Sequence, residues 1–302
     1  MDEIDKQFSR LDEAVANLKR VKANLKRYRA TVLKAAVEGR LVPTEAELSR
    51  REGRSYESGE ELLARILLER RAAWENQRTS GRKKKYVEPQ PPVTSNLPEL
   101  AEGWVWATVE QLADVQLGKM LDRQKHRSGR QLPYLRNINV RWRSIDTKDV
   151  LEMFFESDEL ARSGLKSGDI LVCEGGEPGR AAVWDGRVAE MKYQKALHRV
   201  RFRIGYEPQF LVSLLEHLAE SGRLEQWFTG STIKHFTRES FALLPVPVPP
   251  FAEQHRIVAE VDRFFSSAVE LEAQADANLQ RADRLRKSIL GKAFSSCLLA
   301  QQ

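Results

Sequence analysis

Residues 257–289 read IVAEVDRFFSSAVELEAQADANLQRADRLRKSI, and this stretch decides how the chain is organised. Apolar residues recur in alternating steps of four and three, with one polar member in the series: Ile257, Val261, Phe264, Ala268, Leu271, Ala275, Asn278, Ala282, Leu285 and Ile289. This heptad spacing predicts a long helix that carries a coiled-coil seam. At a rise of 1.5 Å per residue, the 33 residues would span about 50 Å. Asn278, the polar member, is expected to fix the register of pairing.

The N-terminal residues repeat the pattern. Ile4, Leu11, Leu18, Leu25 and Val32 lie seven residues apart, and Ala14, Val21 and Tyr28 fill the second seam position. A shift of 257 residues lays the first series onto Val261, Ala268, Ala275, Ala282 and Ile289, and lays Arg27-Tyr28-Arg29 onto Arg284-Leu285-Arg286. Sharing the Arg-x-Arg pair as well as the hydrophobic phase favours an internal repeat. We therefore predict two coiled-coil spacer helices, over 1–42 and 253–302, that associate with partner helices through Leu11, Leu18, Leu25, Val32, Phe264, Leu271, Asn278, Leu285 and Ile289.

The region between the helices changes character twice. Gly39 and Pro43 end the first helix, and Thr44 with Glu47 has the spacing of a capping box. A second helix is predicted over 60–74, and the basic, then proline-rich residues that follow are typical of a linker, so 43–96 is expected to join two larger parts.

Residues 97–252 are expected to form the central domain. Strand patterns occur at 104–109, 169–173, 181–184 and 197–202, and a helix is expected from Pro208 to about Gln226. Because the alternation is not a regular βαβ series, the predicted fold class is α+β: one mixed α/β domain flanked by two long helices.

The composition argues for a protein of a reducing compartment. Hydrophobic residues make up 41% of the chain and charged residues 30%. Only Cys173 and Cys297 occur, which argues against a disulfide framework and against a zinc site. The first residues are acidic, unlike a signal peptide, and the longest apolar stretch (241–251) is broken by four prolines. A cytoplasmic location is expected.

Positive charge is concentrated in two stretches. The chain carries a net +6, yet residues 119–143 alone hold eight basic residues against one acid, Asp122. Arg78 and residues 82–85 add five more basic residues with no acid among 78–87. Clustering of this kind is the electrostatic footprint expected for nucleic acid.

Three motifs suggest an enzyme. The glycine-rich run 174–180 holds two glutamates that would repel phosphate, so it is interpreted as a turn between strands. Pro249-Pro250-Phe251 resembles the Pro-Pro-aromatic motif of amino-group methyltransferases, but Val248 stands where a hydrogen-bond acceptor is needed. Asp169, Glu190 and Lys192 match the residue types of a magnesium-dependent nuclease, which remains an alternative. The five histidines lack metal-ligand spacing, so no metal site is predicted. A binding protein needs no catalytic residue, and none is predicted outside the nuclease alternative.

Three polar and basic segments favour a binding surface instead. They are 136–143, 191–195 and 230–235, and they accompany the cluster that begins at Lys119. Arginine pairs with guanine and asparagine with adenine in the major groove, and Arg and Lys also hold phosphates. The predicted DNA-binding residues are Lys119, Arg123, Lys125, Arg127, Arg136, Asn137, Asn139, Arg141, Arg143, Lys192, Tyr193, Gln194, Lys195, Ser231, Thr232 and Lys234.

Several stretches resemble one family. Leu97-Pro98-Glu99 with Gly103-Trp104, then Val109-x-x-Leu112 and Gly118, is similar to the opening of target-recognition domains in type I restriction–modification specificity subunits. Gly168-Asp169-Ile170-Leu171-Val172, Gly230-Ser231-Thr232 and Leu244-Pro245-Val246-Pro247-Val248-Pro249-Pro250 with Glu253-Gln254-x-x-Ile257-Val258 resemble later parts of the same domain. Lys26-Arg27-Tyr28-Arg29 through Ala36 to Gly39-Arg40-Leu41 is similar to the family's spacer helix.

The resemblance implies a non-catalytic, prokaryotic DNA-specificity subunit. Such a subunit binds double-stranded DNA and docks methyltransferase subunits, which carry S-adenosylmethionine and methylate adenine; a restriction subunit that uses ATP and Mg can join them. Family members usually carry two recognition domains, whereas this chain has one between two spacer copies. The chain therefore resembles a half-subunit or the second half of a longer protein, and a second half-subunit is expected as partner, either identical or different.

Two other functions stay open at this point. One is a free-standing Mg-dependent nuclease that uses Asp169, Glu190 and Lys192. The other is a coiled-coil scaffold whose central domain binds protein, although this interpretation leaves the basic cluster without a purpose.

Overall fold

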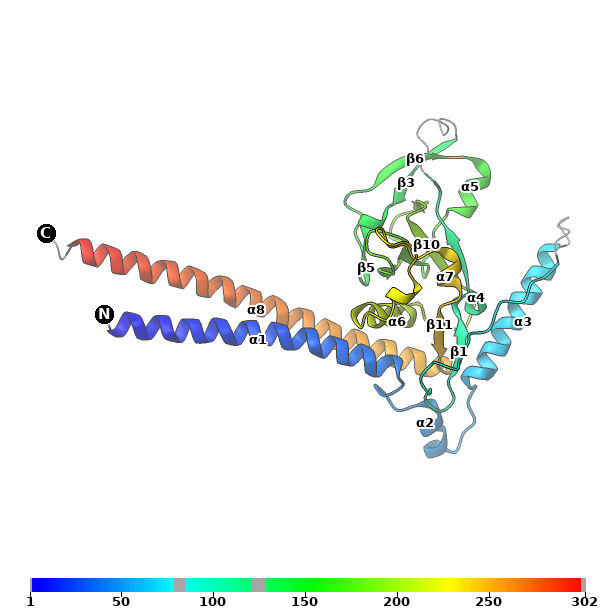
Figure 1. Ribbon diagram of the computed structural model, residues 1–302, viewed down its shortest axis with the longest axis horizontal. Coiled ribbons are helices and arrows are strands. Elements are labelled where there is room, and N and C mark those ends of the chain that lie inside the picture. The colour runs from blue at the N-terminus through cyan, green and yellow to red at the C-terminus, as the bar shows by residue number, and fades with distance from the viewer. Residues whose placement is uncertain (1, 79–84, 121–128, 300–302) are drawn as a thin grey trace. The chain divides into compact units, whose positions relative to one another are not determined.

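The computed structural model describes residues 2–78, 85–120 and 129–299 (Figure 1). The chain divides into two compact units, one made of Met1–Val32 and Glu260–Gln302, the other of Leu33–Ala259. Two long helices, α1 (Asp2–Val37) and α8 (Phe251–Leu299), supply the first unit. The second unit holds all the described strands. Both long helices predicted from the heptads are therefore present as helices, and the fold is α+β as expected.

Within the first unit α1 and α8 run antiparallel. Lys22 forms an ion pair with Asp276 at 2.6 Å, and Arg286 pairs with Asp12. Tyr28 packs edge-on against Phe264, with ring centroids 5.5 Å apart. In these pairs the residue number on α1 rises as the residue number on α8 falls, which shows that the two helices are antiparallel.

Only one of the two predicted seam rows is covered inside the chain. Val261, Ala268, Ala275 and Ala282 are exposed by only 0, 2, 3 and 9%. In the other row Leu271 and Leu285 remain 47 and 53% exposed, and Val21 and Tyr28 on α1 remain 43 and 45% exposed. A single neighbouring helix touches a helix along one line, so much of the second row stays open; Ile257, which is 1% exposed, and Phe264, which packs against Tyr28, are covered.

Two shorter helices follow α1. The predicted capping box is confirmed: Thr44 accepts the N–H of Glu47, and the Glu47 carboxylate accepts the N–H of Thr44, at the start of α2 (Glu45–Glu52). The second predicted helix is α3 (Gly59–Arg78), which is longer than the expected 60–74. Among the helices of the described ranges, none has the length and apolar composition that crossing a membrane requires.

The start of α8 is fastened to the central domain by two buried side chains. The Glu253 carboxylate accepts the Nε1–H of Trp104 at 2.9 Å and the N–H of Glu45 at 2.7 Å. The Gln254 amide donates to the carbonyl of Pro249 and accepts the N–H of Glu207. The Glu-Gln pair thus joins three separated parts of the chain, which explains why these residue types stand at the first turn of this helix.

Two sheets form the body of the domain. A four-stranded antiparallel sheet has the order β2 (Ala113–Leu117), β10 (Leu197–Phe202), β7 (Ile170–Cys173) and β8 (Ala181–Val183). A three-stranded sheet has the order β6 (Leu151–Phe155), β3 (Arg130–Leu135) and β9 (Lys192–Tyr193), with β3 and β9 parallel. The short hairpin β4 (Val140–Arg141) and β5 (Ser144–Ile145) packs near β8.

Short helices connect these strands. They are α4 (Val109–Leu112), η1 (Asn137–Asn139), α5 (Ser157–Arg162), α6 (Pro208–Glu220), η2 (Glu225–Trp227) and α7 (Arg238–Ala242). The predicted helix over 208–226 ends early, since Gly222 takes a left-handed φ of 71° and the chain turns before η2.

The proline-rich stretch 244–250 contains a strand that local sequence patterns did not indicate. β11 (Pro245–Val248) pairs with β1 (Val105–Thr108) in a two-stranded sheet. Proline lacks an N–H, but an edge strand tolerates it where that N–H would face away from the partner. The other predicted strands, at 104–109, 169–173, 181–184 and 197–202, are confirmed to within two residues at each end.

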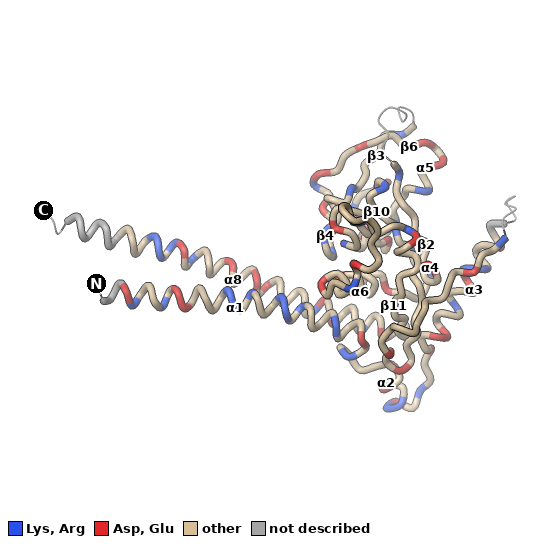
Figure 2. Tube along the Cα trace, in the orientation of Figure 1, with Lys and Arg blue, Asp and Glu red and all other residues tan. Residues whose placement is uncertain are grey.

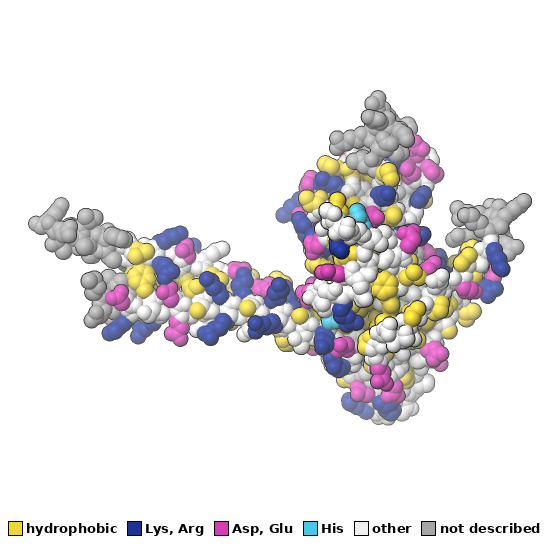
Figure 3. All heavy atoms as spheres, viewed as in Figure 1, with side chains coloured by type: hydrophobic (Ala, Val, Ile, Leu, Met, Phe, Trp, Pro, Cys, Tyr) yellow, Lys and Arg dark blue, Asp and Glu magenta, His cyan; other side chains and the backbone are white. Residues whose placement is uncertain are grey.

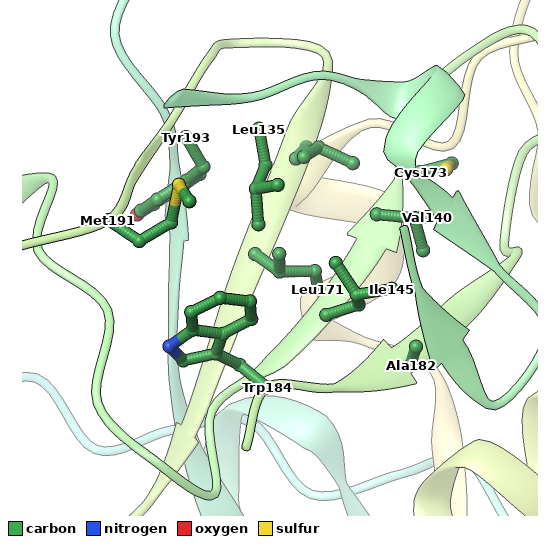
Figure 4. Close-up of a cluster of buried hydrophobic side chains, with 10 residues drawn as sticks. Leu135, Val140, Ile145, Leu171, Cys173, Ala182, Trp184, Met191 and Tyr193 are labelled. Carbon is green, nitrogen blue, oxygen red and sulfur yellow. The ribbon is translucent and has the colours of Figure 1, made fainter. Parts of the chain in front are cut away.

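The main core lies between the two sheets and the β4–β5 hairpin. Trp184, Tyr193 and Leu171 are buried there with Leu135 and Ile145, and Figure 4 shows their side chains pointing toward one another. Burying large aromatic and aliphatic side chains from four strands holds the ends of these strands in fixed positions. Those strand ends carry the polar segments of the domain.

Candidate nucleic-acid interface

The strand ends bring the predicted polar segments together. The N–H of Gln194 donates to the Leu135 carbonyl at 3.0 Å, and the N–H of Lys195 donates to the Lys119 carbonyl at 2.8 Å. These bonds place the residues after β9 beside the end of β3 and the end of β2. Segments that lie more than fifty residues apart in the sequence therefore share one edge of the domain.

The glycine-rich turn 174–180 lies in the middle of this edge. It connects β7 with β8, so its interpretation as a turn between strands is confirmed. The N–H of Glu174 donates to the Ala196 carbonyl, and its own carbonyl accepts the N–H of Phe236. The turn thereby joins the 193–196 segment to the loop that precedes Phe236.

Gly175 and Gly176 allow two of the predicted segments to approach this turn. The Asn137 amide donates to the Gly175 carbonyl at 3.3 Å, and a Cβ on Gly176 would lie 2.8 Å from the same amide nitrogen. On the other side, a Cβ on Gly175 would lie 3.4 Å from Nδ1 of His235. Both flanking segments were predicted from the sequence, but the turn's position between them depends on tertiary structure.

The loop 229–235 is a closed, polar tip. Backbone bonds of 2.8 and 2.9 Å join Thr229 and His235 in both directions. Ser231, Thr232 and Lys234, all predicted to contact DNA, are exposed on this tip. We call residues 118–120, 135–141, 174–180, 193–195 and 229–235 together the candidate interface.

Some predicted residues are exposed on the candidate interface and others serve the fold. Arg141 and Lys195 are exposed, and Asn137 and Gln194 are half-buried. Arg136 is also half-buried and forms an ion pair with Asp149 at 2.6 Å. Figure 2 shows basic and acidic positions interspersed along the trace of residues 33–259, and the face shown in Figure 3 has the same mixture.

Four predicted residues are buried. The Lys119 ammonium donates to the Phe154 carbonyl and pairs with Glu159. The Asn139 amide donates to the carbonyls of Asp146 and Asp149, which closes the turn before β6. These two side chains have their hydrogen bonds inside the domain.

Lys192 and Tyr193 are the other two buried residues. The Lys192 ammonium donates to the Leu160 carbonyl at 2.7 Å, and burial lowers the pKa of this lysine. Burial raises the pKa of Tyr193 to about 12. We therefore exclude Lys119, Asn139, Lys192 and Tyr193 from the side chains proposed to contact DNA.

Arg143 is likewise engaged inside the domain. It occupies the left-handed region at φ 60° in the turn of the β4–β5 hairpin. Its guanidinium donates to Glu216 at 2.6 Å and to Ser213 at 2.8 Å, both on α6. It therefore anchors the hairpin to α6. Arg123, Lys125 and Arg127 lie outside the described residues.

A buried histidine supports the polar tip from below. His198 on β10 is fully buried, and its Nε2 lies 2.7 Å from the Phe236 carbonyl. Burial lowers the pKa of His198 to about 4. The ring is thus neutral near pH 7 and holds the residue that follows the tip.

The three residues of the nuclease alternative, Asp169, Glu190 and Lys192, each bind a different partner within the domain. Both oxygens of Asp169 accept from the Arg201 guanidinium at 2.6 Å, and one also accepts the N–H of Lys166. Glu190 pairs with Arg130, and Lys192 binds the Leu160 carbonyl. Over the ranges that the structure describes, no group of three or more His, Cys, Asp or Glu is arranged to hold a metal ion.

Comparison with known proteins gives one family. Residues 101–281 match the sequence model of the type I restriction modification DNA specificity domain, which is more than half of the chain. The chain is 31% identical over 145 residues to the type I restriction enzyme EcoBI specificity subunit of Escherichia coli, covering 46% of this chain and 30% of that protein. It is 27% identical over 192 residues to the EcoKI specificity subunit of Escherichia coli strain K12, covering 62% and 41%.

A solved structure shares the fold. A chain from a structure described as the basis of complex assembly and conformational transition of the type I R-M system matches with a TM-score of 0.55 at 21% identity, covering 84% of this chain and 60% of that one. The matches span less than half the length of the EcoBI and EcoKI subunits and under two thirds of the solved chain.

Proposed function

The chain belongs to the type I restriction–modification DNA specificity family, and on this basis we propose that it reads one half of a bipartite DNA site without catalysing a reaction itself. The observation that carries the proposal is the candidate interface. Three segments of Arg, Lys, Asn, Ser and Thr, each weak evidence alone, meet on one edge of the domain that matches the family. Side chains of these kinds position a protein on phosphates and read base edges.

The residues proposed to contact DNA are the predicted interface residues that the fold leaves exposed or half-buried. They are Arg136, Asn137, Arg141, Gln194, Lys195, Ser231, Thr232 and Lys234. Arg123, Lys125 and Arg127 stay in the proposal on their sequence alone, because they stand within seven residues of the interface residue Met120 in the chain.

A second copy of the chain is the proposed occupant of the open seam row. Val21 and Tyr28 on α1 and Leu271 and Leu285 on α8 are exposed apolar residues at the same heptad position of their helices, a spacing that suits another pair of helices. Closing this row with a second copy would bury the same residues on both partners, as a twofold interface requires. Two recognition domains would then read two half-sites, with the helices setting the gap between them.

The proposed assembly also includes catalytic partners. Methyltransferase subunits bearing S-adenosylmethionine would dock on the helices, and a restriction subunit using ATP and Mg could join. In the scaffold alternative the central domain binds protein instead, and partner binding would be insensitive to salt.

The test is methylome sequencing of cells that express this chain with and without its methyltransferase subunit. A new bipartite methylated motif that needs both proteins would support the proposal, and a palindromic motif would support the homodimer. A stable complex that methylates no new motif until a second specificity chain is added would support hetero-pairing. If the two proteins form no complex and no new methylated motif appears, the proposed function is refuted.

Variants connect the motif to the candidate interface. Asn137→Ala with Arg141→Ala is expected to weaken binding by about 1–3 kcal/mol for each base-reading side chain that is truncated, and to relax the motif. Lys234→Ala is expected to leave the motif intact and to reduce the salt slope by about one. Arg187→Ala is the matched control, because Arg187 is exposed, lies outside the candidate interface and pairs with Asp185. Magnesium-dependent cleavage that Glu190→Ala abolishes would instead support the nuclease.

A further inference from the structure

Three exposed apolar side chains belong to the candidate interface. Within the described part of 97–252, the large hydrophobic residues that are most accessible are Met120, Ile138, Leu151, Ile233 and Leu243. Met120, Ile138 and Ile233 lie in interface segments, and they are exposed by 58, 49 and 67%. The surface proposed for DNA therefore carries the domain's most exposed apolar groups as well as its polar ones.

The backbone of Ile233 is held by the tip on which it lies. The backbone bonds between Thr229 and His235 close the tip on which it lies. Gly230 takes a φ of 89°, and a Cβ there would lie 2.2 Å from the Ile233 carbonyl. Only glycine allows this close packing, so the backbone of Ile233 is held while its side chain stays in solvent.

The neighbours of Ile233 are all hydrophilic. Ser231, Thr232, Lys234 and His235 are exposed around it on the same tip. Hydroxyl and ammonium groups contact phosphate, but an isoleucine side chain has no such use. In the major groove, the 5-methyl group of thymine is the apolar feature of the base-pair edges, and aliphatic side chains cover it.

We propose that Ile233 reads the 5-methyl group of a thymine in the major groove, while Ser231, Thr232 and Lys234 hold neighbouring phosphates. The inference rests on the proposed function, since it requires that this domain binds a DNA site. It goes further by assigning one base feature to one side chain. A single bound methyl group distinguishes a thymine from a cytosine or a uracil at that position.

The test uses the complex of this chain with its methyltransferase and a duplex of the methylated motif. Each thymine of the motif is replaced in turn by uracil, which lacks the 5-methyl group but pairs in the same way. At one position the affinity of the unaltered complex is expected to fall about four-fold, the effect of leaving one methyl group uncovered. The Ile233→Ser complex is expected to bind the normal duplex more weakly and to be indifferent to uracil at that position.

Leu68→Ser is the matched control, because Leu68 is 70% exposed on α3 and lies outside the candidate interface. It should keep the uracil effect unchanged. The inference about Ile233 is overturned if uracil changes the affinity at no position. It is also overturned if Ile233→Ser weakens binding to the thymine duplex and to the uracil duplex by the same factor, which is the result expected of a side chain inserted between bases. Either result counts against Ile233 alone as long as the complex still binds its motif in preference to other sequences. Absence of any preference for the motif would instead refute the proposed function.

Discussion

Replacing Glu253 by alanine is expected to destabilise the unit Leu33–Ala259, because one buried carboxylate satisfies two buried donors. Glu253 is 0% exposed, and its oxygens accept from Trp104 Nε1 and from the N–H of Glu45. Leaving a buried donor without an acceptor costs about 1–3 kcal/mol. Two such donors give roughly 2–6 kcal/mol. Burial raises the pKa of Glu253, which means that the buried charge is itself unfavourable, so removing the carboxylate offsets part of this cost. We expect a net loss of about 2–4 kcal/mol.

Urea unfolding of the full chain, followed by tryptophan fluorescence, measures this loss. All six tryptophans lie within residues 33–259, so the signal reports on that unit. Glu260→Ala is the control on the same helix: Glu260 pairs with Arg263 at the surface, and its loss should change the stability by less than about 0.5 kcal/mol. Glu253→Gln keeps one acceptor and should fall between the two. A loss below about 1 kcal/mol for Glu253→Ala would refute the reasoning, since the donors would then have found other acceptors.

Three further predictions concern pH, the glycine turn and the helices. Because burial lowers the pKa of His198 to about 4, the unfolded chain binds a proton there more readily. Stability should therefore fall as the pH drops from about 6.5 toward 4, by up to about 3 kcal/mol, and His198→Phe should flatten this part of the profile in urea melts at several pH values. Gly176→Ala and Gly222→Ala both place alanine at a left-handed φ (79 and 71°) and should each cost about 1–2 kcal/mol. Only Gly176→Ala crowds the Asn137 amide, so a binding titration should show weakened DNA affinity for that variant alone. Leu271→Glu should convert the proposed dimer to a monomer in sedimentation equilibrium, whereas Val269→Glu, 56% exposed but outside the seam, should not.

The long helices were predictable from the sequence because their signals are local, whereas the short helices α4, α5 and α7 were not predicted. The heptads that predicted α1 and α8, and the Thr44–Glu47 capping box of α2, depend on residues within one or two turns of each other. The strand β7 also followed from its continuous apolar run, and β10 was predicted as a strand as well. By contrast β9 has two residues, and β11 contains prolines. Both are strands only because a distant partner offers hydrogen bonds, which no local pattern encodes.

The candidate interface was predictable in its segments and not in its assembly. Residues 136–143 and 230–235 stood out because Arg, Asn, Ser, Thr and Lys are concentrated there. The turn 174–180 did not stand out, since its two glutamates argue against a phosphate loop. The turn lies beside Asn137 and His235 because Gly175 and Gly176 have no side chain, so their backbone can come close to these two side chains. The sequence alone does not show which residues face the two glycines.

The sequence also does not show which basic residues bind groups inside the domain and which are free to bind DNA. Lys192, Arg199 and Arg201 donate to the carbonyls of Leu160, Arg162 and Gly164 at and just beyond the end of α5. The last carbonyls of a helix lack intrahelical partners and carry partial negative charge, so cations stabilise them. Within the cluster 119–143 that first suggested nucleic acid, Lys119 and Arg143 are likewise paired inside the domain, so part of that charge also holds short helices and hairpins in place. DNA recognition is therefore supported less by the net charge of residues 119–143 than by the exposed Arg141, Lys195 and Lys234 and the half-buried Asn137 on one edge. Those four should determine the salt slope and the motif, and substitutions at the buried cations should first lower the stability of the domain.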